Sequence, residues 1–351
     1  GTLLVQSMLG ALIVVLIYLI GIQVGFTERS SRLAALVFAL EPGVLFYTSQ
    51  FYTEILFMAL FLGSFLLLTH QKYSHVLLSA FLLGLATLTR PVGLYLSLLY
   101  IVFLAYNYFE KRASWRPALV GLVSFTLVYI TIVTPWFIRN SVQLHSPIFS
   151  TQPSYLAVGS TLPSYMAWHD DISFLKAQTI VYEDFARIGY GDAFWLDGNA
   201  RLVDAISSRL YSTMLHDPFG FAWSQLRFAP QFFLSSSWQT IYDVLARNEF
   251  KTAPFAVLPA TTAARLAGSA FWLCATLLAL IGILAALRKK NMIPIITFFI
   301  VIIIMFAFFT GPFAQMRYRL PVTPFILLFA GMGLYDITEL VRRKRTTQLS
   351  L

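Results

Sequence analysis

The feature that most restricts the fold of this chain is a series of apolar runs, each close to 20 residues long and nearly free of charge. A helix of about 20 apolar residues crosses the roughly 30 Å hydrocarbon core of a bilayer. Of the 351 residues, 58% are apolar and 12% are charged, whereas soluble domains carry about 25% charged residues. We therefore expect an integral membrane protein whose spans are helical, because lipid offers the backbone no hydrogen bonds.

The apolar runs predict about nine membrane spans and an all-α, polytopic helical bundle. The predicted spans are 3–24, 33–49, 54–69, 76–89, 92–106, 117–137, 266–286, 292–310 and 320–340. The spans 76–89 and 92–106 are both short. We expect a turn between them at Arg90, because Pro91 disfavours a helical conformation in the residue before it. The alternative is one kinked helix over 76–106, which would reverse the sidedness of every later segment.

Basic residues are concentrated in alternate gaps between the predicted spans. They are Arg29, Arg32, Lys72, Lys111, Arg112, Arg116, Arg288, Lys289, Lys290, Arg342, Arg343, Lys344 and Arg345. The positive-inside rule predicts that 107–116, 287–291 and 341–351 are cytoplasmic and that 138–265 lies outside the cytoplasm. This topology explains the net charge of +9, so no nucleic-acid partner is expected.

The topology divides the chain into three parts. These are N-terminal transmembrane helices (1–137), an extracytoplasmic subdomain (138–265) and C-terminal transmembrane helices (266–351). In the subdomain, apolar spacing predicts a helix over 198–215. Asp217 before Pro218 predicts the start of another helix, which should end or kink near Pro230. The aromatic face of that helix is expected either against the bilayer surface or within the subdomain.

The same alternation puts residue 1 outside, and Gly1 leads directly into the first predicted span. The economical expectation is that at least one upstream span and its outer loop are missing from this sequence. A protein with its N-terminus outside is the alternative.

A few ionisable residues fall outside the basic gaps and the subdomain. They are Glu41, Glu54, Arg90, Arg317 and Arg319. The three arginines are predicted to form a cationic pocket at the outer interface, because a guanidinium binds two phosphate oxygens at once. The alternatives are interfacial anchoring and ion pairing with Glu54.

The two glutamates each have a structural explanation. Glu54 follows Thr53 at the start of a span, where a carboxylate meets the positive end of a helix dipole; alternatively, it faces the substrate pocket. Glu41 precedes Pro42 and is expected to pair within the bundle.

The sequence gives little support for a metal site or a disulfide bond. His169, Asp170 and Asp171 are metal-ligand types, but no second cluster at ligand spacing accompanies them, so no metal site is assigned. The single cysteine, Cys274, cannot form an intramolecular disulfide.

Four segments, in order, resemble motifs of bacterial GT-C glycosyltransferases. They are YTEILF at 52–57, GLATLTRP at 84–91, TPWFIRN at 134–140 and RYRLP at 317–321. The order, spacing and predicted sidedness resemble the protein O-mannosyltransferase and aminoarabinose-transferase-like branch over nearly the whole chain.

The resemblance implies an enzyme that moves a hexose or pentose from a polyprenyl-phosphate or polyprenyl-diphosphate carrier. The acceptor would be a protein, lipid or glycan at the outer face of a bacterial plasma membrane. Arg90, Arg317, Arg319, Tyr52 and Arg139 would bind the donor, and Glu54 would contact sugar or metal as a secondary catalytic candidate.

In this family the general base is usually an aspartate in the first outer loop, which would lie upstream of residue 1. The fragment alone is therefore expected to be inactive. The resemblance leaves room for a divalent metal ion and implies no other cofactor. A membrane transporter or a non-catalytic scaffold is the alternative, although the halves of the sequence lack the internal repeat typical of secondary transporters.

Overall fold

In the computed structural model, the described residues form helices and connecting turns, with no β-strand among them. The described residues are 1–70, 72–110, 115–143, 148–189, 200–242, 258–313 and 315–349. Parts of the predicted segments 107–116, 138–265 and 341–351 lie outside them. The predicted all-α fold class is confirmed.

The helices form two compact units. Unit 1 comprises Gly1–Ile132, Phe233–Ile304 and Gln315–Leu351, and unit 2 comprises Val133–Phe232 and Met305–Ala314. These units are defined by contacts, whereas the predicted domains are defined by the side of the membrane. The domain boundaries 1–137, 138–265 and 266–351 therefore stay a prediction.

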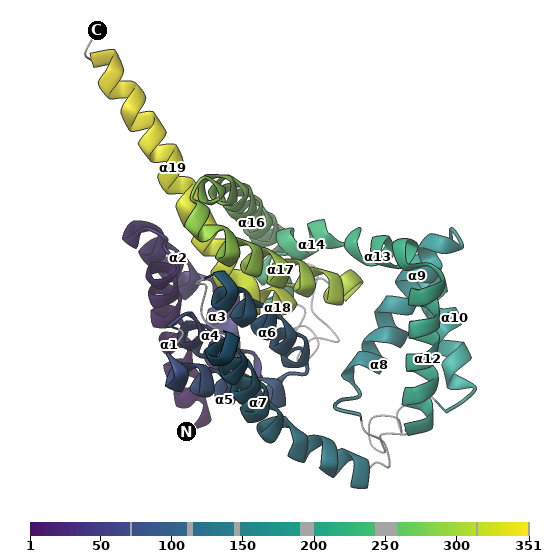
Figure 1. Ribbon diagram of the computed structural model, residues 1–351. Helices are drawn as coiled ribbons and strands as arrows, with labels where there is room; N and C mark the ends of the chain where they lie inside the picture. Colours follow the sequence, from purple (N-terminus) through teal and green to yellow (C-terminus); the bar gives the residue numbers. More distant parts are fainter. Residues whose placement is uncertain are drawn as a thin grey trace. The chain divides into compact units, whose positions relative to one another are not determined.

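Unit 1 consists mainly of long apolar helices (Figure 1). Its helices are α1 (Thr2–Gln23), α2 (Glu28–Leu40), α3 (Pro42–Thr48), α4 (Glu54–His70), α5 (Tyr73–Thr89), α6 (Gly93–Glu110), most of α7 (Trp115–Gln143), α16 (Leu258–Leu287), most of α17 (Ile293–Thr310), α18 (Met316–Arg319) and α19 (Thr323–Leu349). Short 3-10 turns at Lys290–Met292 and Leu320–Val322 precede α17 and α19.

Among the described residues, six helical segments are long and apolar enough to cross a membrane. They are Thr2–Gln23, Gly93–Glu110, Trp115–Gln143, Thr262–Leu287, Lys290–Phe313 and Met316–Arg342. The bent pair α2 and α3 makes a seventh if the two helices form one span. The two remaining predicted spans coincide with α4 and α5, which are apolar but have only 17 residues each. The chain is a multi-pass membrane protein.

The predicted span 33–49 is bent by 60° between α2 and α3. The break falls at Glu41, directly before Pro42, whose ring cannot continue the preceding helix. The carboxylate of Glu41 is 3% exposed and caps the new helix, because its Oε2 accepts a 2.9 Å hydrogen bond from the Val44 amide. Ser237 donates a second hydrogen bond to the same carboxylate. Glu41 thus pairs within the bundle, as expected.

The turn predicted at Arg90 is present. Helix α5 ends at Thr89, and α6 begins at Gly93. Arg90 itself is extended, with φ −146° and ψ 126°, as expected for a residue before proline. The single-helix alternative over 76–106 is wrong.

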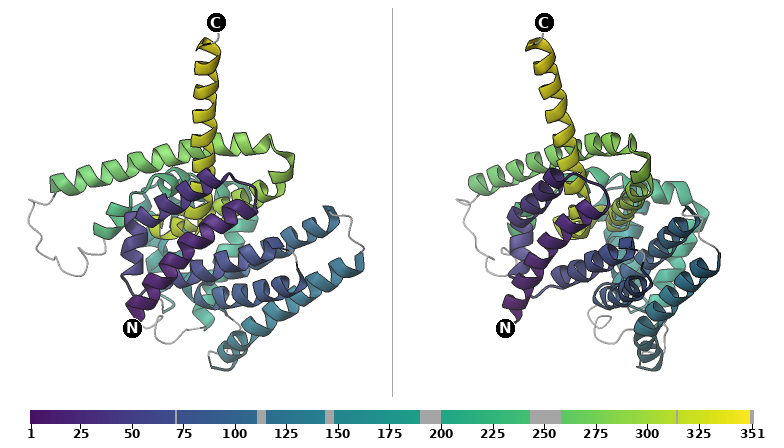
Figure 2. Two further views of the ribbon diagram at one scale, coloured as in Figure 1. Left: turned by 90° about the vertical axis from the view of Figure 1, so that its left-hand side faces the viewer. Right: turned by 60° about the vertical axis from the view of Figure 1, so that its left-hand side comes forward.

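Helices α16 and α19 pack together through glycines, and α19 continues beyond the other helices of unit 1 (Figure 2). A Cβ on Gly282 would lie 1.9 Å from the Phe329 carbonyl oxygen, and one on Gly333 would lie 2.0 Å from that of Leu278. Only glycine therefore permits this approach, which is typical of helix pairs in membranes.

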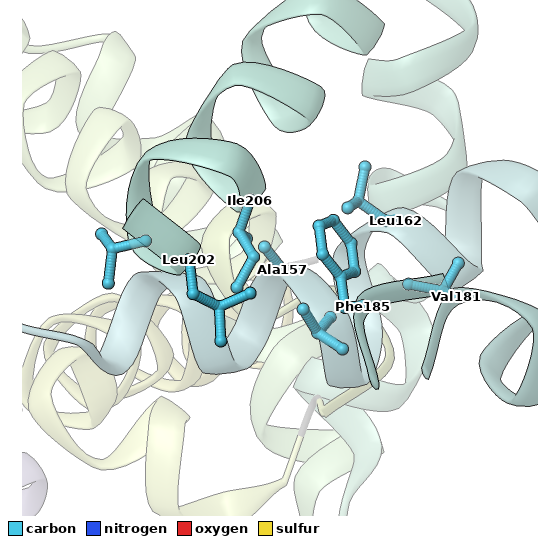
Figure 3. Close-up of a cluster of buried hydrophobic side chains, with 8 residues drawn as sticks. Ala157, Leu162, Val181, Phe185, Leu202 and Ile206 are labelled. Carbon is cyan, nitrogen blue, oxygen red and sulfur yellow. The ribbon is translucent and has the colours of Figure 1, made fainter. Parts of the chain in front are cut away.

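Unit 2 is a smaller helical unit with its own core. Its elements are the end of α7, α8 (Gln152–Leu156), a π-helical turn (Ala157–Thr161), α9 (Leu162–His169), α10 (Phe174–Ala186), α12 (Ala200–His216), α13 (Pro218–Leu226), most of α14 (Ala229–Leu234) and the end of α17. Figure 3 shows the buried apolar cluster among them, which includes Ala157, Leu162, Val181, Phe185, Leu202 and Ile206.

The helix starts predicted in this segment agree with the structure. The helix expected over 198–215 is α12, although its first two predicted residues lie outside the described ones. Asp217 caps α13 by accepting a 2.9 Å hydrogen bond from the Gly220 amide. Helix α13 ends at Leu226, and Pro230 lies in the first turn of α14.

The predicted topology can be tested by cysteine labelling. The exposed residues Lys176, in the predicted outer subdomain, and Lys289, in a predicted cytoplasmic gap, are suitable reporters. Exposed Cys274 is first replaced by Ala. A membrane-impermeant maleimide should label Lys176→Cys in intact cells, and should label Lys289→Cys only after the membrane is opened. Labelling of Lys289→Cys alone in intact cells would show that the topology is inverted.

Candidate functional site

The structure brings two of the predicted arginines onto one carboxylate within unit 1. Glu54 is the first residue of α4, Arg90 lies in the turn after α5, and Arg317 lies in α18. Arg90 Nη1 is 2.6 Å from Glu54 Oε1. Arg317 Nε donates a hydrogen bond to the same oxygen. We call these three residues the Glu54 cluster.

The three side chains differ in their exposed fractions. Glu54 is 0% exposed, Arg90 is 12% exposed and Arg317 is 37% exposed. A buried carboxylate is costly unless cations replace its hydration. Two guanidinium groups do so at Oε1, whereas the buried Oε2 has no hydrogen-bond partner among the described residues. The cluster has one carboxylate and two guanidinium groups, so it keeps one net positive charge. The exposed part of Arg317 makes this charge accessible to an anion.

An aromatic side chain supports Arg317. Its Cζ lies 4.8 Å from the ring centroid of Tyr52, in a cation–π arrangement. The Tyr52 ring in turn lies 5.6 Å from that of Tyr47, and the Tyr52 carbonyl accepts a 2.8 Å hydrogen bond from Gln6. Tyr52, predicted as a donor-binding residue, therefore contacts the cluster.

Arg319 makes a different set of contacts from Arg90 and Arg317. It is 0% exposed, with its Cζ 3.7 Å from the ring centroid of Trp272. Its Nη1 donates to the Phe233 carbonyl at 2.7 Å, and its Nη2 donates to that of Ser235 at 2.8 Å. These carbonyls lie at the end of α14, where helices leave acceptors unpaired.

Helix geometry explains why Arg317 and Arg319 separate. Both lie in α18, where residues two apart point in nearly opposite directions. The prediction that all three arginines share one pocket did not consider that Arg317 and Arg319 lie on opposite sides of a helical turn. The contacts of Arg319 favour a structural anchor, and its role as a phosphate ligand stays a prediction.

Arg139 belongs to unit 2, near the end of α7. Its guanidinium lies 4.7 Å from the ring centroid of Trp136, and its Nη1 donates a 2.9 Å hydrogen bond to Asn140. Asn140 and Trp136 both donate to the Phe149 carbonyl. These contacts hold Phe149 against the end of α7, and the donor-binding role of Arg139 stays a prediction.

The acidic and histidine residues of the described ranges form no group of three or more that could hold a metal ion. His169 and Asp170 pair at 2.7 Å, between Nδ1 and Oδ1. Involvement of a divalent metal stays a prediction.

The sequence did not indicate the partners that hold the arginines and Glu41. Ser237, Trp272 and the Phe233 carbonyl are ordinary residues of their segments, and only the tertiary structure brings them into contact. The one feature of the sequence that could have indicated these partners is the run of three serines at 235–237, directly before Trp238.

Comparisons with known proteins found a similar fold among the solved structures. No family profile matches the chain, and no curated protein matches it. Among solved structures, the chain is similar to the archaeal oligosaccharyltransferase AglB from Archaeoglobus fulgidus, in complex with an inhibitory peptide and a dolichol-phosphate. The TM-score is 0.51 at 14% sequence identity, covering 99% of this chain and 40% of AglB. The apo form of the Archaeoglobus fulgidus oligosaccharyltransferase gives a TM-score of 0.49 at 15% identity, with the same coverage.

This likeness concerns the fold, because the sequence identity is low. The chain spans about 40% of the length of the solved oligosaccharyltransferase. The GT-C assignment and the specific branch named from the sequence motifs both stay predictions.

Replacing the carboxylate of the Glu54 cluster should lower the stability of the protein. Glu54→Gln leaves Arg90 and Arg317 without their shared counter-charge. We expect a loss of about 2–4 kcal/mol in the free energy of unfolding, less than the full penalty for a wholly buried pair because Arg317 keeps some water. The measurement is equilibrium unfolding in mixed micelles.

Glu28→Gln is the matched control for this change. Glu28 pairs with Arg32 on α2, but both side chains are more than half exposed, so the effect should stay below about 0.5 kcal/mol. Equal stabilities of the two variants would contradict the role of Glu54 as the centre of the cluster.

Proposed function

We propose that the chain carries the donor site of a GT-C glycosyltransferase that takes a sugar from a polyprenyl-phosphate-type carrier. The observation that carries the proposal is the convergence of Arg90 and Arg317 on buried Glu54, which leaves an accessible positive charge. The fold likeness to AglB supports this assignment.

The chemistry required of such a site is stabilisation of a leaving phosphate. As the sugar departs, negative charge grows on the carrier phosphate, and a fixed guanidinium is worth more there than in water. Glu54 would hold the arginines in place before the donor arrives, so that little reorganisation accompanies the reaction. The ring of Tyr52 would restrict Arg317 further. We assign no general base to the residues of this chain.

The proposed partners follow from the same comparison. The structure of AglB contains a dolichol-phosphate and an inhibitory peptide. A lipid phosphate fits the positive charge of the Glu54 cluster, and a peptide is one member of the acceptor class of proteins, lipids and glycans. We further propose that transfer takes place at the outer face of a bacterial plasma membrane, in line with the charge bias of the loops.

The proposal is tested by transfer assays on the full-length protein with a panel of polyprenyl-phosphate sugars. Arg317→Ala and Arg90→Ala should each lower the transfer rate by about 30- to 1000-fold, because a contact that strengthens in the transition state is lost. Arg317→Lys should recover only part of the rate, since lysine lacks the planar fork.

Arg32→Ala provides a matched control, because Arg32 is an exposed arginine paired with Glu28. Its transfer rate should equal that of the parent. Rates are compared at equal amounts of folded protein. If both cluster variants stay within about twofold of the parent, the arginines are structural and the proposed site is wrong.

A further inference from the structure

Unit 2 contains a cavity of about 540 Å³ that plays no part in the proposed transfer site. It lies among α9, α10 and α12, all of which belong to this unit. Its volume falls within the range of about 300–1,000 Å³ typical of small-molecule sites. The residues that line it combine an apolar floor with a polar rim.

The floor of the cavity is an edge of the core of unit 2. Leu162, Val181 and Phe185 line the cavity and also belong to the buried cluster drawn in Figure 3. Each is less than one-tenth exposed. Because the core fixes these side chains, the floor is a preformed apolar surface against which a flat apolar face can pack.

The rim offers both hydrogen-bond donors and acceptors. Asp170 and Asp184 supply carboxylate oxygens, and Arg209 supplies guanidinium donors. His169 is held by its 2.7 Å contact with Asp170. The Tyr165 ring is stacked on the His169 ring, with centroids 5.4 Å apart and planes inclined by 29°. Both residues line the cavity, and we call this pair its aromatic wall.

The charges of the rim restrict the class of ligand. The rim carries two carboxylates and Arg209, and Arg187 Nη1 lies 3.5 Å from Asp184 Oδ1. These four charges cancel, so neither an anion nor a cation gains a net attraction there. A neutral molecule with hydroxyl groups can both accept from Arg209 and donate to the aspartates. A pyranose ring has such hydroxyls around its edge and an apolar C–H face, which matches the floor and the aromatic wall.

We propose that this cavity binds a neutral carbohydrate, of one or two sugar rings. The proposal goes beyond the transfer reaction, because it stands on the residues of unit 2 alone.

The test uses the full-length protein in a detergent without a sugar head group. Mannobiose, maltose and N,N′-diacetylchitobiose are the neutral probes, and glucose 6-phosphate and a basic tripeptide are the comparison probes. Saturation-transfer NMR and titration calorimetry should detect at least one neutral disaccharide. Arg209→Ala and Asp170→Asn should each weaken its binding by about tenfold, because one polar contact is lost. Thr213→Trp should abolish binding by filling the cavity that Thr213 lines.

Two residues of α12 provide matched controls. Arg201 and Asp204 are exposed on the same helix but do not line the cavity, so Arg201→Ala and Asp204→Asn should bind the disaccharide as the parent does. Absence of binding by all neutral probes would overturn the proposal. So would binding that Thr213→Trp leaves unchanged, or binding of the phosphorylated sugar or the peptide alone.

The outcome is separable from that of the transferase proposal. Arg317→Ala, which should lose transfer, should keep disaccharide binding. If the Glu54 cluster variants transfer normally while the cavity variants lose binding, the transferase site is wrong and the carbohydrate site stands.

Discussion

Removing a carboxylate from water costs several kcal/mol unless cationic groups replace its hydration. Glu54 meets this condition only when two arginines from distant segments reach it, Arg90 from the turn after α5 and Arg317 from α18. Glu54 can therefore be buried only where the turn after α5 and α18 are both packed against the start of α4. The same packing assembles the positively charged site.

The neighbouring Arg319 shows how a second charge can be buried by different means. Two carbonyl oxygens accept hydrogen bonds from its guanidinium, the Trp272 ring covers its face, and the buried Glu41 carboxylate attracts its charge. These contacts fix α18 from one side, while the Glu54 cluster holds it from the other. The four residues of α18 are thus held from both sides, which restricts the conformations of Arg317 before any ligand binds.

Much of the architecture could be predicted from the sequence because membrane spans obey strong length and charge rules. Pro91 and Asp217 marked helix boundaries correctly, since both act through local backbone chemistry. The bend at Glu41 was missed because an apolar run does not report direction, although Pro42 was its visible cause. Separating Arg319 from Arg317 in the sequence would have required knowing that α18 is a helical turn. Four residues are too few to show a helical periodicity.

The close contact between α16 and α19 also restricts where the arginines of α18 can lie within unit 1. Gly282 and Gly333 lock the two helices in one register, and α18 with its arginines directly precedes α19 across a short turn. Sliding α19 by one helical turn would move the arginines by about 5.4 Å. The glycine contact therefore fixes the position of these arginines along α16, because any sliding of α19 would bring backbone atoms into collision.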